Sequence, residues 1–367
     1  MRARLAVCAL LGALSLTMAP ASSSAAVSRG FYGVIPITQL TPAAVDAMGR
    51  AKVGTLRIIA RWPDIEPTPG SYDWSYLDLV VGNAARNGIH VLPYPYGTPA
   101  WVGVNCGGLS AGECERVPPI GSQQARDAWK AFLRNLVGRY GPGGEFWALN
   151  PDIPQLPITH YQPWNEPSSP TYWQPEPSSR KYGALVKISH EAITSVDPQA
   201  KIILAGLFGT PRGDLSSRNV MWKYLGRLYK VKGIEGAFDA VALHPYSPNL
   251  AGIEFQLDKA RDKIVKNHDR RTGIWITEIG WGSDPPTADR PLIKGEAGQA
   301  NLLRKSFSRL TNHRSKWKVK GLVWYTWQDP GFAFEGCSFC DSAGLLQEDG
   351  SPKPAWNAYL EFTGGTG

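Results

Sequence analysis

The stretch ITHYQPWNEPSSP, residues 158–170, predicts a β-strand that ends in polar residues. Its first part is rich in β-branched and aromatic residues, which favour strands. Pro167 then ends the strand, because proline has no N–H to give to a neighbouring strand. The two residues before it are Asn165 and Glu166, whereas a simple turn needs only residues such as Gly and Asn. The end of this strand is therefore a candidate functional site.

Seven other stretches have the strand pattern, and segments with helical periodicity separate them. The predicted strands are residues 31–37, 54–62, 90–97, 158–166, 201–207, 238–247, 273–282 and 321–329. The predicted helices are residues 42–51, 75–88, 123–141, 181–198, 220–230, 253–268, 297–310 and 354–363. Strands separated by helices pair in parallel, because each crossover returns the chain to the same edge of the sheet. Eight such units predict an α/β fold, the (β/α)8 TIM barrel.

A single catalytic domain, residues 27–367, is expected. About 340 residues are enough for one barrel with a single core, and no linker rich in Pro, Gly or Ser divides the chain. The alternative is an open, doubly wound sheet. It is disfavoured because FYGVIPI, residues 31–37, is followed by ITQLTPAA and not by a glycine-rich phosphate-binding turn.

A second carboxylate is expected to face Glu166. In TGIWITEIGWGS, residues 272–283, strand alternation places Ile274, Ile276 and Glu278 on one face. The two isoleucines would fill the barrel, so Glu278 would point inward at its rim. Strands four and seven lie on opposite sides of an eight-stranded barrel. The two glutamates can therefore face each other across its mouth, at the end where TIM barrels carry their active sites.

Two facing carboxylates are the groups that glycosidic cleavage requires, and a separation of about 5–5.5 Å favours the retaining, covalent route. At that distance their repulsion is about 3 kcal/mol, which is enough to keep one of them protonated near neutral pH. On the strand GTLRIIARW, Arg57 shares the inward face with Thr55 and Ile59. We expect it, together with the tyrosine of LHPYS, to favour the charged form of Glu278.

These motifs resemble the signature of the clan A retaining glycoside hydrolases, which are (β/α)8 barrels. The core of the resemblance is PWNEP, residues 163–167, with TEIGW, residues 277–281. Further segments resemble the family 39 and family 5 (cellulase-like) branches of that clan; they are residues 61–78, 96–101, 140–151, 243–247 and 349–359. The resemblance covers nearly the whole mature chain.

The resemblance implies a role for each matching residue. Glu166 is the acid/base, Glu278 is the nucleophile, and Asn165 binds the sugar 2-hydroxyl. The residues expected to support the catalytic pair are Arg57, His244 and Tyr246. An ideal strand would point Asn165 and Glu166 apart, so Pro167 and a bulged strand end are expected to turn both toward the cleft.

Four tryptophans are candidates for sugar contacts. Trp324 or Trp327 is expected to form the floor of the subsite on the non-reducing side of the cleaved bond. Alternation puts these two on opposite faces, so only one can serve, and the sequence does not distinguish them. Trp62 and Trp101 are either sugar platforms or packing residues.

Residues 1–26 are expected to be a secretory signal peptide, with a basic start, the apolar run 5–18 and a cleavage site near Ala25 or Ala26. The run is too short for a membrane anchor, and no later stretch is long enough to span a bilayer. Removing the segment lowers the formal net charge from +8 to +6. The remaining basic residues are scattered, which does not favour a nucleic-acid partner.

Four cysteines remain in the mature chain, and in a secreted protein their spacing predicts two local disulfides, Cys106–Cys114 and Cys337–Cys340. Within the first loop, GLSAG (108–112) matches the esterase pattern G-x-S-x-G around Ser110. That motif requires a strand before it and a helix after it, so a chance match is the better interpretation. No HExxH motif and no EF-hand loop occur, so neither a metal nor another cofactor is expected.

The sequence therefore predicts a secreted, monomeric, retaining glycoside hydrolase that cleaves β-glycosidic bonds of oligo- or polysaccharides. The many tryptophans and two long loops, residues 98–121 and 142–157, favour endo action. An exo-acting, β-xylosidase-like enzyme is the alternative within this class. A carbohydrate-binding barrel without activity, and an esterase that uses Ser110, are the alternatives outside it.

Overall fold

The structure is a computed structural model that describes residues 27–209, 219–333 and 336–367. The predicted signal peptide, residues 1–26 with its cleavage site near Ala25 or Ala26, lies outside the described residues. Among the described residues, no helix combines the length and the apolar character that crossing a bilayer requires.

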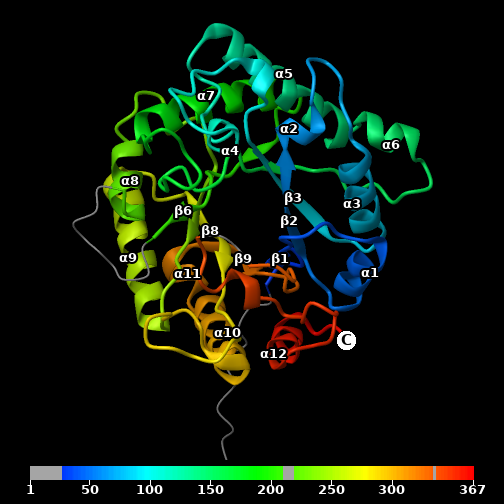
Figure 1. The fold of residues 1–367 in the computed structure, drawn as a ribbon, viewed down its shortest axis with the longest axis vertical. Helices are drawn as coiled ribbons and strands as arrows, with labels where there is room; N and C mark the ends of the chain where they lie inside the picture. The colour runs from blue at the N-terminus through cyan, green and yellow to red at the C-terminus, as the bar shows by residue number, and fades with distance from the viewer. Residues whose placement is uncertain (1–26, 210–218, 334–335) are drawn as a thin grey trace, which may run out of the picture.

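The centre of the molecule is a curled parallel sheet (Figure 1). Its strands are β1 (Tyr32–Ile35), β2 (Thr55–Arg61), β3 (His90–Tyr96), β6 (Leu207–Phe208), β7 (Ala240–His244), β8 (Gly273–Ile279) and β9 (Val319–Tyr325). They run side by side in the order β3-β2-β1-β9-β8-β7-β6, and a separate pair consists of β4 (His160–Tyr161) and β5 (Lys201–Ile202). All the strand pairs are parallel, as crossover helices require.

Backbone hydrogen bonds on both sides of the β4–β5 pair close the ring. On one side Gln162 N–H donates to Pro93 O at 3.0 Å, and Trp164 N–H donates to Pro95 O at 2.8 Å. In a regular parallel pair, Pro93 and Pro95 would also donate their own N–H groups to the neighbouring strand. Proline has no N–H, so fewer hydrogen bonds join β3 to β4 than in a regular pair. On the other side Leu204 N–H donates to Ala240 O at 2.8 Å.

The segments β5 and β6 are thus two parts of one barrel strand, residues 201–208. Counted this way, the barrel has the eight strands that the sequence predicts, in sequence order around the ring. The predicted TIM-barrel fold is confirmed.

Helices cover the outside of the barrel (Figure 1). Within the described residues the longer ones are α1 (Pro42–Arg50), α3 (Ser75–Arg86), α5 (Gln123–Tyr140), α7 (Ser179–Thr194), α8 (Met221–Leu228), α9 (Leu250–Lys266), α10 (Gly295–Asn312) and α12 (Pro354–Thr363). Each overlaps one predicted helix. Short side-chain caps explain several of the starts: Thr41, Ser122, Ser178 and Asn249 each accept a hydrogen bond from a backbone N–H in the first turn.

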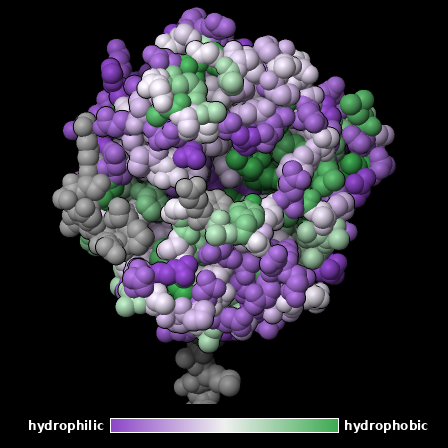
Figure 2. Space-filling view, in the orientation of Figure 1, coloured by the Kyte–Doolittle hydropathy of each residue, from purple (hydrophilic) through white to green (hydrophobic). Residues whose placement is uncertain are grey.

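Shorter helices lie in the segments that connect these elements. They are α2 (Trp62–Ile65), η1 (Ala100–Val102), α4 (Ala111–Cys114), α6 (Glu145–Leu149), α11 (Arg314–Trp317) and η2 (Cys340–Ser342). The space-filling view shows a hollow near the middle of the visible face, with hydrophobic residues along one side of it (Figure 2).

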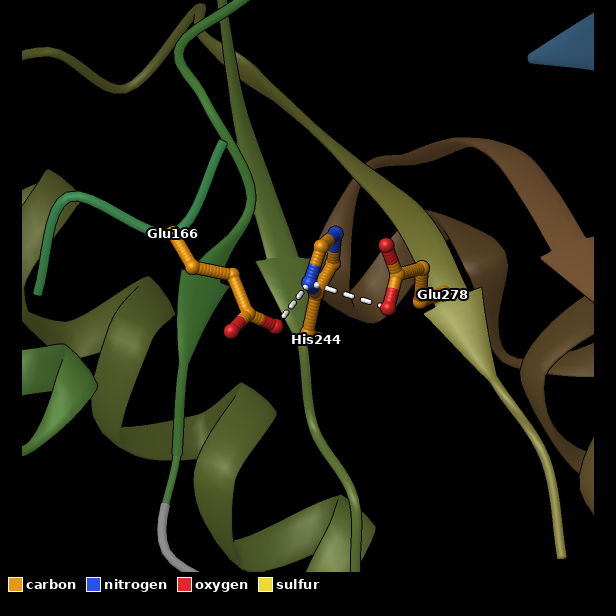
Figure 3. Close-up of side chains that lie close together, drawn as sticks. All are labelled: Glu166, His244 and Glu278. Carbon is orange, nitrogen blue, oxygen red and sulfur yellow. Dashed lines mark hydrogen bonds and ion pairs between the residues drawn. The ribbon is translucent and has the colours of Figure 1, made fainter. Parts of the chain in front are cut away.

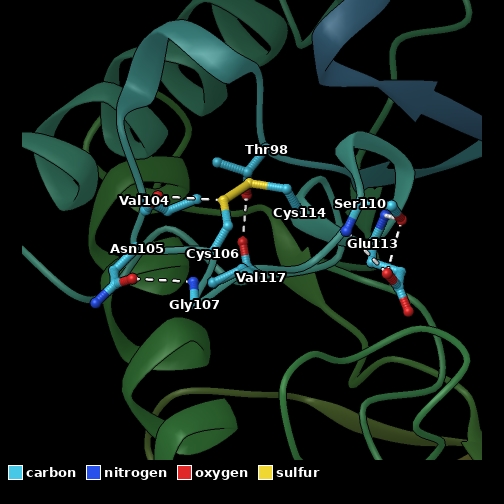
Figure 4. The surroundings of a disulfide bond; sticks show 9 residues. All are labelled: Thr98, Val104, Asn105, Cys106, Gly107, Ser110, Glu113, Cys114 and Val117. Atoms are coloured by element: carbon cyan, nitrogen blue, oxygen red, sulfur yellow. Dashed lines mark hydrogen bonds between the residues drawn. A yellow bond between two sulfur atoms is a disulfide. The ribbon is translucent and has the colours of Figure 1, made fainter.

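Both predicted disulfides are present. Cys106 and Cys114 are joined across a Cα–Cα distance of 5.2 Å, and Cys337 and Cys340 across 5.6 Å. Ser110 lies in the first of these loops and caps α4: its hydroxyl donates to Glu113 Oε2 at 2.7 Å, and Glu113 N–H donates back to it (Figure 4). The hydroxyl thus has a structural role, and among the described residues no histidine makes the hydrogen bond to it that an esterase nucleophile needs.

Candidate active site

Four strand ends bring the predicted catalytic residues together inside the barrel mouth. Arg57 comes from β2, Glu166 follows β4, His244 ends β7, and Glu278 lies near the end of β8. All four are buried; Glu166 is 6% exposed and Glu278 is 7% exposed. Charged groups at this depth are costly unless partners compensate for the lost hydration, so their contacts decide which of them is charged.

The turn after β4 adopts left-handed backbone angles at two residues. Trp164 has φ +78° and Glu166 has φ +38°. These angles break the strand alternation, so that the adjacent Asn165 and Glu166 both reach the same cavity, as the sequence analysis expected of a distorted strand end. The aromatic ring of Trp164 is held between Trp129 and Trp173, at centroid distances of 6.2 and 5.7 Å. This packing offsets the strain of the turn.

Arg57 connects three strands through its guanidinium. It donates to Glu278 Oε1 at 2.6 Å, to Asn165 Oδ1 at 2.7 Å and to Gln162 Oε1 at 2.6 Å. The ring of Tyr94 lies 4.1 Å from the guanidinium carbon and adds a cation–π contact. These contacts compensate the fully buried guanidinium of Arg57 for its lost hydration.

Glu278 is surrounded by groups that favour its charged form. Besides Arg57, the Tyr246 hydroxyl donates to Glu278 Oε2 at 2.8 Å. Burial raises the pKa of Glu278, whereas Arg57 and the Tyr246 hydrogen bond oppose the rise. The two oxygens of this carboxylate thus each have a donor, which stabilises a negative charge.

Glu166 has a different environment. Burial and the negative charge of Glu278 raise the pKa of Glu166 well above its ordinary value, and Arg57 opposes the rise from farther away. His244 Nδ1 lies 2.6 Å from Glu166 Oε1. Burial and the nearby Arg57 lower the pKa of His244 well below its ordinary value, so the imidazole is neutral and does not supply a counter-charge. The surroundings of Glu166 therefore favour its protonated form more than those of Glu278 do.

The side chains of Glu166 and Glu278 point toward each other, and the imidazole of His244 contacts both (Figure 3). Oxygens of Glu166 and Glu278 and a ring nitrogen of His244 all lie within 4.8 Å of one another. His244 Nδ1 is 3.4 Å from Glu278 Oε2, and its Nε2 is 2.9 Å from Thr277 Oγ1. The Oδ1 of Asn165 accepts from Arg57, and its Nδ2 makes no hydrogen bond within the described part of the chain, so these two N–H groups remain available to a ligand.

The structure also brings in residues that the sequence analysis missed. Gln162 binds Arg57 and, through Nε2, the carbonyl of Leu204 at 2.9 Å. Thr277 is turned toward His244 because the register between β8 and β9 shifts between Ile276 and Ile279. Regular alternation assigns Thr277 to the face opposite Glu278, so only the irregularity brings both inside. The sequence did contain a signal for Gln162, because a polar side chain in the middle of a predicted strand indicates a candidate site residue.

Neither Trp324 nor Trp327 faces the two carboxylates, contrary to the expectation. Trp324 points outward to Phe307 of α10, at 6.2 Å between centroids, and donates to Ala343 O. Trp327 lies after the end of β9 and packs on Trp356 of α12 at 5.4 Å. The reason is the alternation itself: Tyr325, next to Trp324, takes the inward position.

Tyr325 lies beside the catalytic pair. Its ring is 6.2 Å from that of Tyr246 and 6.1 Å from that of Phe339. Burial raises the pKa of Tyr325 well above its ordinary value, and the charges of Glu278 and Glu166 contribute. Of Trp324, Tyr325 and Trp327, Tyr325 is thus the residue that faces the two glutamates.

The remaining two tryptophans, Trp62 and Trp101, both donate a hydrogen bond to Glu66. Trp62 is fully buried between α2 and α5, with Phe132 stacked at 5.3 Å, and its Nε1 donates to Glu66 Oε2. This is a packing position. Trp101 is partly exposed and donates to the carbonyl of Glu66 at 2.9 Å, with Trp62 at its edge. Of the pair, only Trp101 keeps a surface that a ligand could reach.

If Tyr325 contacts the sugar, Tyr325→Ala should lower kcat/KM about 10- to 100-fold, the usual worth of an aromatic contact. Trp327→Phe is the matched control, and should lower Tm while leaving kcat/KM within about 2-fold. Steady-state kinetics and thermal unfolding of both variants check this. The opposite pattern, with Trp327→Phe impaired and Tyr325→Ala intact, would restore the original expectation.

Comparisons with known proteins agree with this architecture. A family model described as β-galactosidase (Glyco_hydro_42) matches residues 38–106. The comparison with curated protein sequences found no match. Several solved structures share the fold. A family 39 glycoside hydrolase from the gut symbiont Bacteroides cellulosilyticus WH2 is 19% identical with a TM-score of 0.65, over 92% of this chain and 64% of that chain.

Two further structural neighbours are a β-xylosidase and a xylanase. A monomeric β-xylosidase from Caulobacter crescentus CB15 is 17% identical with a TM-score of 0.62, over 92% of this chain and 68% of that chain. Xylanase 10B from Thermotoga maritima is 16% identical with a TM-score of 0.60, over 92% of this chain and 95% of that chain. The resemblance to the clan A glycoside hydrolases is thereby confirmed at the level of the fold.

Proposed function

We propose that the protein is a retaining glycoside hydrolase that cleaves β-glycosidic bonds by double displacement, with Glu278 as nucleophile and Glu166 as acid/base. The observation that carries the proposal is the short separation of two carboxyls in unlike environments. Their facing oxygens lie within 4.8 Å of each other. Retaining enzymes hold the pair about 5–5.5 Å apart, whereas inverting enzymes need about 6.5–9.5 Å to admit a water molecule.

In the first step Glu278 attacks the anomeric carbon while Glu166 gives its proton to the departing glycosidic oxygen. The bond from the anomeric carbon to that oxygen breaks, and a glycosyl ester of Glu278 forms. Arg57 and Tyr246 hold Glu278 ionised and orient it before attack. The free Nδ2 of Asn165 is suited to donate to the sugar 2-hydroxyl, where hydrogen bonds strengthen in the transition state.

In the second step the roles change because the charges change. Formation of the ester removes the negative charge of Glu278, which is one of the two causes that raise the pKa of Glu166. The pKa of Glu166 then falls, so the carboxylate left by the first step can take a proton from water. The water attacks the anomeric carbon, and Glu278 is released. Glu166 thereby serves as the acid in the first step and as the base in the second.

The substrate class follows from the neighbours and is part of the proposal. Xylan-type β-linked polysaccharides are the first candidates, and β-galactosides are the second. We expect the partly exposed ring of Trp101, on the loop after β3, to contact a further sugar unit, which favours endo action on a long chain. An exo-acting, β-xylosidase-like enzyme remains the alternative, and a barrel that only binds carbohydrate is the alternative without chemistry.

Secretion is also proposed. Two disulfides in a chain of this size are typical of an oxidising compartment, and residues 1–26 have the pattern of a signal peptide. We expect the mature protein to be a monomer that needs no cofactor. Determining the N-terminal residue of the secreted protein tests the cleavage site near Ala25 or Ala26.

The proposal is tested by incubating the protein with a panel of β-linked polysaccharides and resolving the products by size. A ladder of oligosaccharides at early times indicates endo action, and monosaccharide alone indicates exo action. Proton NMR of the first product gives its anomeric configuration, which should be β. Binding without cleavage of any polysaccharide would favour the barrel without activity, and an α product would reject retention.

A specific pH dependence is expected. Activity should fall at low pH as Glu278 gains a proton, and at high pH as Glu166 loses one. Tyr246→Phe removes a hydrogen bond that lowers the pKa of Glu278, so that pKa rises and the acid limb moves to higher pH. We expect kcat/KM at the optimum to fall about 10- to 100-fold, the worth of a hydrogen bond to a charged group. The pH profiles of kcat/KM for both proteins check this, and an unmoved acid limb would contradict it.

A further inference from the structure

The catalytic centre contains the elements of a metal site that sequence motifs do not show. Motif rules detect ligands that are close together in sequence, such as HExxH. Here the three side chains come from different strands, Glu166 after β4, His244 on β7 and Glu278 on β8. Two carboxylates and one imidazole are a ligand set that suits zinc and related divalent transition metals.

We propose that Glu166 Oε1, His244 Nδ1 and Glu278 Oε2 form a binding site for a divalent transition-metal ion, with Zn²⁺ as the simplest case, and that the ion competes with the substrate. The proposal goes beyond the proposed hydrolytic function, because it makes the ion an inhibitor and not a cofactor. Binding would release the proton of Glu166, because a carboxyl binds a metal in its deprotonated form, and the ion would occupy the space between the two carboxylates that the reacting sugar needs.

The distances are close to those of a tetrahedral site. Zinc lies about 2.0–2.2 Å from nitrogen and oxygen ligands, so neighbouring ligand atoms are about 3.3 Å apart. The separation of His244 Nδ1 and Glu278 Oε2 is 3.4 Å. The separation of His244 Nδ1 and Glu166 Oε1 is 2.6 Å and would need to widen by under an ångström. The third separation, between the two carboxylate oxygens, is at most 4.8 Å, so the two glutamates would have to approach each other by up to about 1.5 Å.

The surroundings orient the imidazole for this role. His244 Nε2 lies 2.9 Å from Thr277 Oγ1, and a hydrogen bond donated there leaves a lone pair on Nδ1, which faces the carboxylates. Ligand histidines commonly donate their other ring N–H to such a partner. Within the described residues, no other group of three His, Cys, Asp or Glu side chains meets the same spacing.

Arg57 opposes the ion but does not block it. The guanidinium binds Glu278 Oε1, the oxygen that points away from His244, at 2.6 Å. Glu278 Oε2 keeps one lone pair beside the bond from Tyr246. Three protein ligands would leave the fourth zinc position to water, as in open zinc sites.

The test is isothermal titration calorimetry of the full mature protein, treated with EDTA and dialysed, with zinc chloride alone as the probe. We expect one site. Glu166→Gln, Glu278→Gln and His244→Ala should each weaken zinc binding at least about 10-fold, since losing even an indirect partner of a ligand costs this much. His268→Ala removes an exposed histidine and should bind as the unmodified protein does.

No heat of binding at millimolar zinc would overturn the proposal, as would binding that all three site variants retain. The two glutamine variants are isosteric with the native residues, so their result stands if His244→Ala folds poorly. Calorimetry does not depend on hydrolysis, so its outcome is separate from that of the proposed function. With an active enzyme, zinc should raise KM and leave kcat unchanged, and a fall in kcat at constant KM would reject competition.

Discussion

Glu278→Ala is expected to abolish hydrolysis, with kcat reduced roughly 10⁴- to 10⁶-fold. The variant removes the carboxylate that is proposed to form the glycosyl ester and leaves Arg57 without this ion-pair partner. Initial rates on an aryl β-glycoside and on the preferred polysaccharide measure the loss. Glu191→Ala, which removes a carboxylate from the outer surface of α7, is the matched control and should keep full activity.

Azide turns this loss into a positive result. The space left by the Glu278 side chain lies on the face of the sugar opposite the leaving group, so azide can attack there while Glu166 still protonates the leaving group. The product should be the α-glycosyl azide, with inverted configuration, and the rate should partly recover. Full activity of Glu278→Ala without azide on any glycoside that the enzyme cleaves would reject the assignment.

The proximity of Glu166 and Glu278 could be predicted because Glu278 continues the inward face of β8 and both residues lie near strand ends. Ile274 and Ile276 are fully buried, and Glu278 continues on their side of β8. The ends of parallel strands meet at one rim, so a glutamate at the end of strand four and another near the end of strand seven had to lie across the same opening. Burial and neighbouring charge then distinguish the two residues, and these depend on groups from β2 and β7.

The floor of the site could not be predicted in the same way. In WYTWQD, residues 324–329, the two tryptophans were the candidates because large flat rings suit sugar contacts. The side chain that points inward is that of Tyr325, which lies between them. Where a strand ends, alternation ends too, and the direction of Trp327 depends on the turn that carries it to α12. For Thr277 the alternation rule fails in the opposite direction. The rule points this side chain out of the barrel, but the irregular register of β8 turns it inward.

Glu166→Ala is the second variant with a large expected effect, and its result should depend on the leaving group. For a natural glycosidic bond the departing oxygen is a poor leaving group without a proton, so kcat/KM should fall about 10²- to 10⁴-fold. For a dinitrophenyl glycoside, whose leaving group needs no proton, the first step should remain fast. The second step still lacks its base, so the ester of Glu278 accumulates, and both kcat and KM fall.

The stereochemistry of azide rescue separates the two glutamates. In Glu166→Ala azide replaces the water of the second step, on the side of the sugar that the leaving group occupied. It should give the β-glycosyl azide, with retained configuration, whereas Glu278→Ala gives the α-anomer. Product NMR distinguishes the two. Because azide can enter only where a carboxylate has been removed, opposite anomers from the two variants require the carboxylates to lie on opposite sides of the same sugar. Exchanged anomers would mean that the nucleophile is Glu166, despite the donors that Arg57 and Tyr246 direct at Glu278.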